Sequence, residues 1–174
     1  MEVRDNVDTS ASPVELQSRP LYAVEGSNFN TGVADIDRNL TATTGWGVNS
    51  YTGDRAAAPF AILDSIYSGM QLVLEADPTA NFPALDAFWS VNNTPLSGSP
   101  DVGEIGTSYY TTDPDGGQPN PSLFLLGDAD SDTEEFDDHV VVHEWGHYFE
   151  DNFSRSDSIG GAHSLGESLD ARVA

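Results

Sequence analysis

The chain has 174 residues, of which 29 are acidic and 6 are basic, so its formal net charge at pH 7 is -23. A surface so poor in cations has no Lys or Arg stripe to displace the counterions around phosphates, which excludes DNA and RNA as partners. There is no cysteine, so disulfides and thiolate metal sites are also excluded, and any bound metal must use His, Asp or Glu.

The first third of the chain consists of short apolar runs separated by Gly, Asn, Asp, Ser and Thr. Examples are residues 14–16 and 21–24. This pattern predicts an N-terminal strand-rich segment over residues 1–53, followed by a second region over 54–174. The opening residues contain no apolar core of a signal peptide. We expect a secreted or extracellular protein whose export signal lies outside this chain.

Residues 56–75 carry apolar side chains three to four positions apart, which predicts a long amphipathic helix. Pro59 suits its first turn, and the Asp-Pro pair at 77–78 ends it. Polar residues interrupt the apolar run, so it does not predict a membrane span. This stripe is expected to face the core. Its large residues are Phe60, Leu63, Tyr67 and Met70, and Ile62, Ile66 and Val73 broaden it.

Three strand-like runs follow, at residues 87–91, 107–111 and 123–126, and the linkers between them are rich in Pro, Gly, Asn and Asp. An acidic stretch then leads into a second predicted helix at 138–153. Asp137 or Asp138 can cap that helix, because a carboxylate there accepts the free N–H groups of the first turn. We expect an α+β fold, with a mixed sheet packed on the second helix.

The second helix carries the motif His143-Glu144-x-x-His147. Positions four apart lie one above the other on a helix, so both imidazoles can point at one cation. Imidazole nitrogens are preferred ligands of zinc, and Glu144 is placed to take a proton from a water that the metal activates. The motif therefore predicts a zinc site, with His143 and His147 as ligands and Glu144 as general base.

A catalytic zinc normally has a third protein ligand. The continuation typical of metzincins needs Gly at position 150 and His at position 153, but the chain has Glu150 and Phe153. The acidic candidates further along are Glu167 and Asp170, in a second helical piece over residues 166–171.

With this order of motifs, the chain resembles the gluzincin metallopeptidases, in particular the thermolysin-like ones. The resemblance covers roughly residues 56–170 and implies a zincin-like fold that cleaves peptide bonds. It also implies that Glu167, about twenty residues beyond His147, is the third zinc ligand. Residues 122–130 resemble the family's edge strand, which implies that an extended peptide substrate pairs with them by strand addition.

Two features depart from that family. The family usually has an Asp four residues after the Glu ligand, whereas this chain has Asp170 at three and Ala171 at four. An acid beyond Ala174 is therefore an alternative third ligand. The family's C-terminal helical lobe has no counterpart here, so we expect the chain to be a fragment. His163 is the only imidazole after the motif and is interpreted as a loop histidine.

Alternating carboxylates precede the zinc helix, at Asp128, Asp130 and Asp132. Hard oxygen ligands at such spacing suit calcium, and the family resemblance also implies calcium near the zinc helix. An EF-hand would need Gly at position 133 and Glu at position 139, where the chain has Thr133 and His139. A calcium loop of another type and a solvated acidic turn both remain open.

The sequence thus predicts a zinc-dependent endopeptidase that acts on peptide or protein substrates, with calcium as a possible second metal. The alternative from another class is a non-catalytic extracellular module, or an inactive truncated fragment, that binds calcium or zinc without turning over a substrate.

Overall fold

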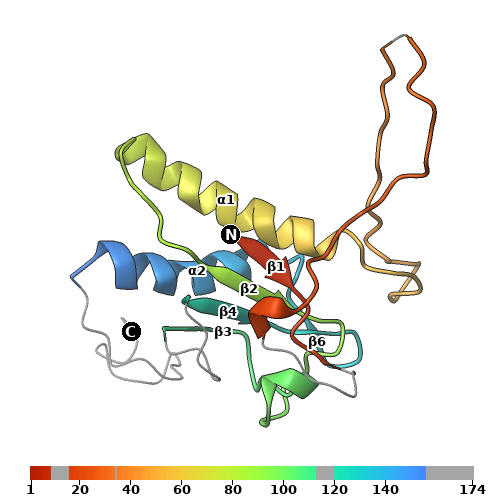
Figure 1. Ribbon diagram of the computed structural model, residues 1–174. Helices are drawn as coiled ribbons and strands as arrows, with labels where there is room; N and C mark the ends of the chain where they lie inside the picture. Colours follow the sequence, from red (N-terminus) through yellow and green to blue (C-terminus); the bar gives the residue numbers. More distant parts are fainter. Residues whose placement is uncertain (9–15, 34, 113–119, 156–174) are drawn as a thin grey trace.

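The computed structural model describes residues 1–8, 16–33, 35–112 and 120–155, and these form an α+β fold (Figure 1). The helices are α1 (Ala58–Ala76) and α2 (Asp138–Phe153), with short 3-10 turns η1 (Leu16–Ser18) and η2 (Pro100–Val102). The strands are β1 (Glu2–Arg4), β2 (Asp86–Trp89), β3 (Tyr109–Thr111), β4 (Ser122–Leu125), β5 (Gly127–Asp128) and β6 (Asp132–Thr133). Over this part of the chain, no helix combines the length and the apolar character that a bilayer crossing requires.

The main sheet has the strand order β1-β2-β4-β3. β1 and β4 run parallel to β2, whereas β3 is antiparallel to β4, so the predicted mixed sheet is confirmed. The short strands β5 and β6 form a separate hairpin between β4 and α2. Because β1 pairs with β2, residues 2–4 belong to the same sheet as the strands that follow α1.

The prediction that residues 122–130 form an edge strand is wrong. β4 pairs with β2 on one side and with β3 on the other, and all four of its residues are buried. A continuous apolar run without alternation is typical of a strand that is covered on both faces, and Leu123–Leu125 has that pattern. The edge strand next to β4 is the antiparallel β3.

Both helices cover one face of the sheet (Figure 1). Side chains from β1, β2 and β4 pack there against buried residues of α1 and α2, and they include Val3, Trp89 and Leu125. The opposite face carries a smaller cluster, in which Phe88 and Phe124 stack with ring centroids 5.0 Å apart. Successive side chains of a strand point to opposite faces of the sheet, so β2 and β4 contribute to both clusters. Helix α2 lies on the face that carries the larger cluster.

Helix α1 matches its prediction in extent, with proline in its first turn and Asp77 as its C-cap. Its predicted buried stripe is wrong in part, because Phe60 and Tyr67 are 44% and 56% exposed. The buried positions include Ile62 and Ile66, as predicted, together with Gly69 and the small residues Ala58, Pro59 and Ser65. Helix α2 occupies the sheet face beside α1, and close approach between the two helices selects the narrow stripe that contains Gly69.

The N-terminal segment contains less strand than predicted. Apart from β1, its described residues before α1 contribute η1 and isolated bridges, one of which joins Arg4 to Leu21. The part drawn in orange in Figure 1 extends away from the sheet. Within that part, polar residues and glycine outnumber apolar ones, so little apolar surface is available to hold it against the core.

Candidate metal centre and the adjoining cavity

The motif-bearing helix α2 is fixed at its start by two polar contacts. The Asp137 carboxylate accepts hydrogen bonds from the backbone N–H groups of His139 and Val140, at 3.0 and 3.3 Å, which confirms the predicted N-cap. The Ser65 hydroxyl of α1 donates to the Asp138 carboxylate at 2.7 Å. These contacts tie the first turn of α2 to α1 and set the helix in place one turn before the motif.

Packing then determines which side of α2 faces outward. Val141, Trp145 and Tyr148 are buried against the sheet and α1. These positions are four and three residues apart, so they form one face of the helix. His143, Glu144 and His147 lie outside this buried face, where a ligand can reach them.

The two motif histidines converge. Their Nε2 atoms lie 3.2 Å apart, and their ring centroids are 4.8 Å apart with the planes nearly perpendicular. Two nitrogens that bind zinc at about 2.0–2.1 Å in a tetrahedral arrangement are roughly 3.3–3.4 Å apart. The observed separation of His143 and His147 therefore fits a pair of zinc ligands without rearrangement of the helix.

Glu144 is partly buried, and its surroundings raise the pKa of its carboxyl group to about 7. Desolvation is the largest cause, and the negative charge of Glu134 adds to it. A hydrogen bond from the backbone N–H of Tyr110 acts in the opposite direction, since it stabilises the carboxylate. Tyr110 of β3 therefore lies near the motif glutamate.

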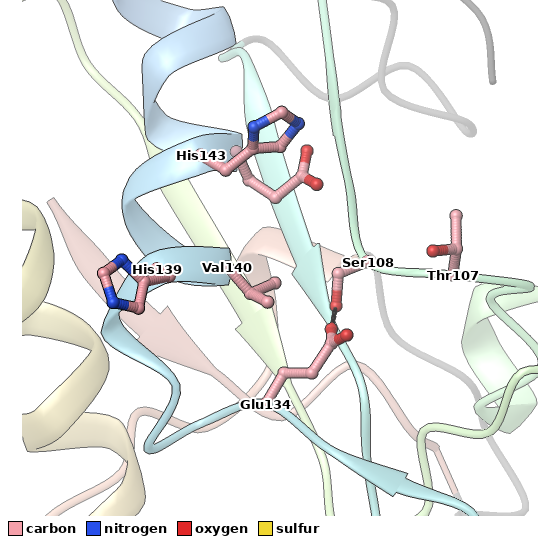
Figure 2. Close-up of a pocket in the computed structure, with 7 residues that line it drawn as sticks. Thr107, Ser108, Glu134, His139, Val140 and His143 are labelled. Atoms are coloured by element: carbon pink, nitrogen blue, oxygen red, sulfur yellow. Dashed lines mark hydrogen bonds between the residues drawn. The ribbon is translucent and has the colours of Figure 1, made fainter. Parts of the chain in front are cut away.

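A cavity of about 370 Å³ opens beside the motif. The residues that line it come from the start of β3, the β6–α2 connection and the outer face of α2: Thr107, Ser108, Glu134, His139, Val140, His143 and Glu144. Figure 2 shows His139 and His143 on successive turns of α2, with Glu134 and Ser108 pointing toward one another. The candidate base and one candidate ligand thus share a cavity with the residues that lead into the edge strand.

Ser108 holds the second carboxylate of this cavity. Its hydroxyl donates to Glu134 and accepts a hydrogen bond from the backbone N–H of Leu126 at 2.9 Å. The backbone N–H of Glu134 in turn donates to the Leu126 carbonyl at 3.3 Å. Desolvation and neighbouring carboxylates raise the pKa of Glu134, although the Ser108 hydrogen bond opposes them.

The neighbouring Glu135 is held differently. It is fully buried and forms an ion pair with Arg55, which also donates to the Gly127 carbonyl. The Arg55 guanidinium lies over the rings of Tyr51 and Trp89, at 4.6 and 5.3 Å from their centroids. This pair anchors the β5–β6 hairpin to the core, next to the cavity.

Other predicted site residues remain outside what the structure describes. Glu167, the predicted third ligand, lies beyond residue 155, as do His163 and Asp170. Among the described residues, no group of three or more His, Asp or Glu side chains could hold a metal ion. Within the described part of the chain, the candidate ligands that the motif brings together are thus His143 and His147.

The same result, that no group of three or more potential metal ligands occurs among the described residues, also concerns the aspartates of the acidic turn. Asp128 and Asp132 pair across the β5–β6 hairpin, Ser131 donates to Asp128 at 2.8 Å, and Asp130 is exposed at the turn. These three carboxylates do not gather as a metal-binding group. The arrangement is that of a polar hairpin turn, and calcium binding there stays a prediction.

Sequence reasoning missed Glu134, Ser108 and the Arg55–Glu135 pair as parts of this region. Glu134 is one of several acids in a row, and nothing in the local pattern distinguishes it from its solvated neighbours. Arg55 offered a weak signal, because it is one of only 6 basic residues in a strongly acidic chain. Arginine is rare in this chain, and Arg55 lies just before the helix predicted at residues 56–75. It is therefore a candidate for an ion pair inside the protein.

Comparisons of the chain with protein-family models, with curated proteins and with solved structures gave no significant match.

Proposed function

We propose that the chain is a zincin-like catalytic domain and that it acts as a zinc-dependent endopeptidase. The observation that supports this most strongly is the convergence of His143 and His147, whose Nε2 atoms are 3.2 Å apart. This spacing fits two ligands of tetrahedral zinc, as it also fits a hydrogen bond between the two imidazoles. Glu144 adjoins the pair and lines the cavity beside it.

In this proposal each group of the chain has a distinct task. Zinc, when bound, supplies Lewis acidity, which lowers the pKa of water and polarises a carbonyl oxygen. Glu144 accepts the proton from the attacking water and passes it to the leaving amine. The backbone N–H of Tyr110 in β3 favours the ionised form of Glu144, which the transfer requires.

The edge strand is the proposed binding place for the substrate. Among the described strands, β3 lies at the end of the order in the main sheet, next to β4, which supports strand addition of an extended peptide there. The residues immediately before it, Thr107 and Ser108, share the cavity with Glu144. A peptide along β3 would therefore pass close to the proposed base.

Glu167 is the proposed third zinc ligand. Two imidazoles alone leave the coordination of a catalytic zinc incomplete, so a further donor is required. Measuring zinc content in Glu167→Gln tests this residue by itself. Zinc stoichiometry that is unchanged in Glu167→Gln would reject it as a ligand.

The second candidate is a module that binds zinc without catalysis. The lack of a third ligand among residues 1–8, 16–33, 35–112 and 120–155 favours it. The test is casein hydrolysis by the wild type and by Glu144→Gln, with zinc content measured in both. Glu75→Gln, which removes one exposed carboxylate from α1, is the matched control.

We expect the wild type and Glu75→Gln to bind zinc and cleave casein, and Glu144→Gln to keep zinc but lose cleavage. Zinc retention without hydrolysis by the wild type would instead support the binding module. His143→Ala and His147→Ala should each lose zinc, and retention of the metal by both variants would reject either reading of the site.

A further inference from the structure

The ionisable residues that line the cavity beside the motif are two carboxylates and two histidines, His139 and His143. Two of its lining residues are carboxylates, Glu134 and Glu144, and none of its described lining residues is Lys or Arg. Both carboxylates line the same space. A cation between them would offset their mutual repulsion, whereas a neutral ligand would leave it in place.

Glu134 is held in position by a hydrogen bond and not by an ion pair with any described residue. Its carboxylate accepts from Ser108, and Ser108 is itself buried and fixed by the backbone of Leu126. Within the described residues, no arginine forms an ion pair with Glu134. The adjacent Glu135 shows the contrast, since it turns inward and pairs with Arg55.

Among the described residues, few cations are available to neutralise this cavity. The chain contains no lysine, and its net charge is -23. Three of its arginines, Arg4, Arg19 and Arg55, already pair with other carboxylates. A fixed carboxylate in a cavity, without an internal counter-ion, is the arrangement that recognises a basic side chain through a charge-assisted hydrogen bond.

The size and place of the cavity agree with a single long side chain. Its volume of about 370 Å³ lies near the lower end of the roughly 300–1,000 Å³ that small-molecule pockets span. His143 and Glu144 form one part of its lining, so a side chain that enters it belongs to a residue close to the bond under attack. Val140 supplies an apolar contact for the methylene groups of that side chain.

We propose that this cavity is a specificity pocket for an arginine or lysine side chain next to the scissile bond, with Glu134 as the residue that pairs with it. This inference rests on the proposed peptidase function. Ser108 is a positioning residue, which keeps the Glu134 carboxylate turned into the pocket.

The first test uses quenched fluorescent peptides that are identical except for one position, which carries either arginine or its neutral isostere citrulline. The variable position is placed in turn on each side of the scissile bond. We expect the full chain, loaded with zinc, to prefer arginine by roughly tenfold or more in kcat/KM at one of these positions. Glu134→Gln should bring this ratio close to one, and the matched control Glu75→Gln should preserve it.

The second test measures binding without catalysis, as amide chemical shifts of Thr107 and Ser108 on addition of N-butylguanidinium or its neutral analogue N-butylurea. We expect N-butylguanidinium to shift both amides in the wild type and in Glu75→Gln but not in Glu134→Gln, and N-butylurea to shift neither. Binding of both probes alike would reject recognition of charge.

The two tests separate this inference from the function on which it rests. Cleavage without a preference for arginine, or with a preference that survives in Glu134→Gln, overturns the pocket and leaves the peptidase intact. If the wild type cleaves no peptide, the peptidase proposal fails. Guanidinium binding that depends on Glu134 would then still support a pocket for a basic group, and its absence would overturn that as well.

Discussion

Gly69 of α1 lies directly against the indole of Trp145 in α2, so that a Cβ at position 69 would stand 2.8 Å from two of the ring carbons. The contact brings the two helices together immediately behind the motif, since Trp145 lies between Glu144 and His147 in sequence. The absence of a side chain at one residue of α1 therefore helps to set the depth at which the candidate metal centre sits.

We expect Gly69→Ala to destabilise the fold by about 1–3 kcal/mol, because the added methyl group must displace the Trp145 ring or separate the helices. Urea unfolding monitored by circular dichroism measures this change. Gly146→Ala is the matched control, since a Cβ there meets nothing within 4 Å. Relief of the helix-interior glycine should stabilise this control by up to about 1 kcal/mol. Equal effects of the two substitutions would contradict the packing argument.

Removing the N-cap of α2 should weaken the start of the helix that bears the motif. We expect Asp137→Ala to cost about 1 kcal/mol in the free energy of unfolding, because the N–H groups of His139 and Val140 lose their acceptor. Asp137→Asn keeps an oxygen acceptor and should cost less. Asp130→Ala removes a similar charge from an exposed turn and serves as the control in the same unfolding experiment. A loss as large in Asp130→Ala would point to a general charge effect.

The buried Arg55–Glu135 pair predicts strongly non-additive substitutions. Arg55→Met should destabilise the fold by about 3–5 kcal/mol, because it leaves the Glu135 charge buried without its partner. We expect the double variant Arg55→Met/Glu135→Leu to recover part of this loss, since neither charge remains. A double-mutant cycle from guanidinium unfolding curves provides the measurement. Simple additivity of the two single changes would show that the pair is not coupled.

The raised pKa of Glu144 predicts a pH dependence in the metal-free chain. Its folded-state pKa of about 7 exceeds the ordinary value of 4.5, so the native state binds the extra proton between these values. Stability should therefore fall as the pH rises from about 4.5 to about 7. Allowing for the partial exposure of the carboxyl, Glu144→Gln should be more stable than the wild type at pH 8 by about 1–2 kcal/mol.

Thermal unfolding in the presence of a chelator, at a series of pH values, tests this expectation. Glu75→Gln is again the control, because its carboxylate is exposed on α1. Wild-type and Glu144→Gln curves that stay parallel from pH 4.5 to 8 would show that burial of Glu144 imposes no such cost.

The elements that the sequence predicted best are those whose signals are local. The bounds of α2 and its cap at Asp137 agree with the prediction, because an acidic capping residue followed by a spaced apolar face defines a helix within a short window. The runs at residues 87–91 and 123–126 likewise correspond to β2 and β4. These signals can be recognised in the sequence of the element itself, without knowing which other elements pack against it.

Features that depend on partners distant in sequence were predicted less well. The edge of the sheet was assigned to β4 rather than β3, since strand order depends on long-range pairing that a run of apolar residues does not encode. The face of α1 was misjudged in part for the same reason: its buried stripe runs through Gly69, which contacts Trp145 far along the chain. Glu134 became recognisable only when the fold placed it beside Glu144.

The pairing of β1 with β2 has a consequence for the order of folding. Glu2 aligns with Asp86, whereas α1, β2, β3, β4 and α2 follow one another along the chain and contact their neighbours at shorter separation. Closing the long loop between β1 and β2 carries a larger entropic cost than any step within that contiguous unit. The N-terminal strand is thus suited to dock last, onto a nucleus that already contains both histidines.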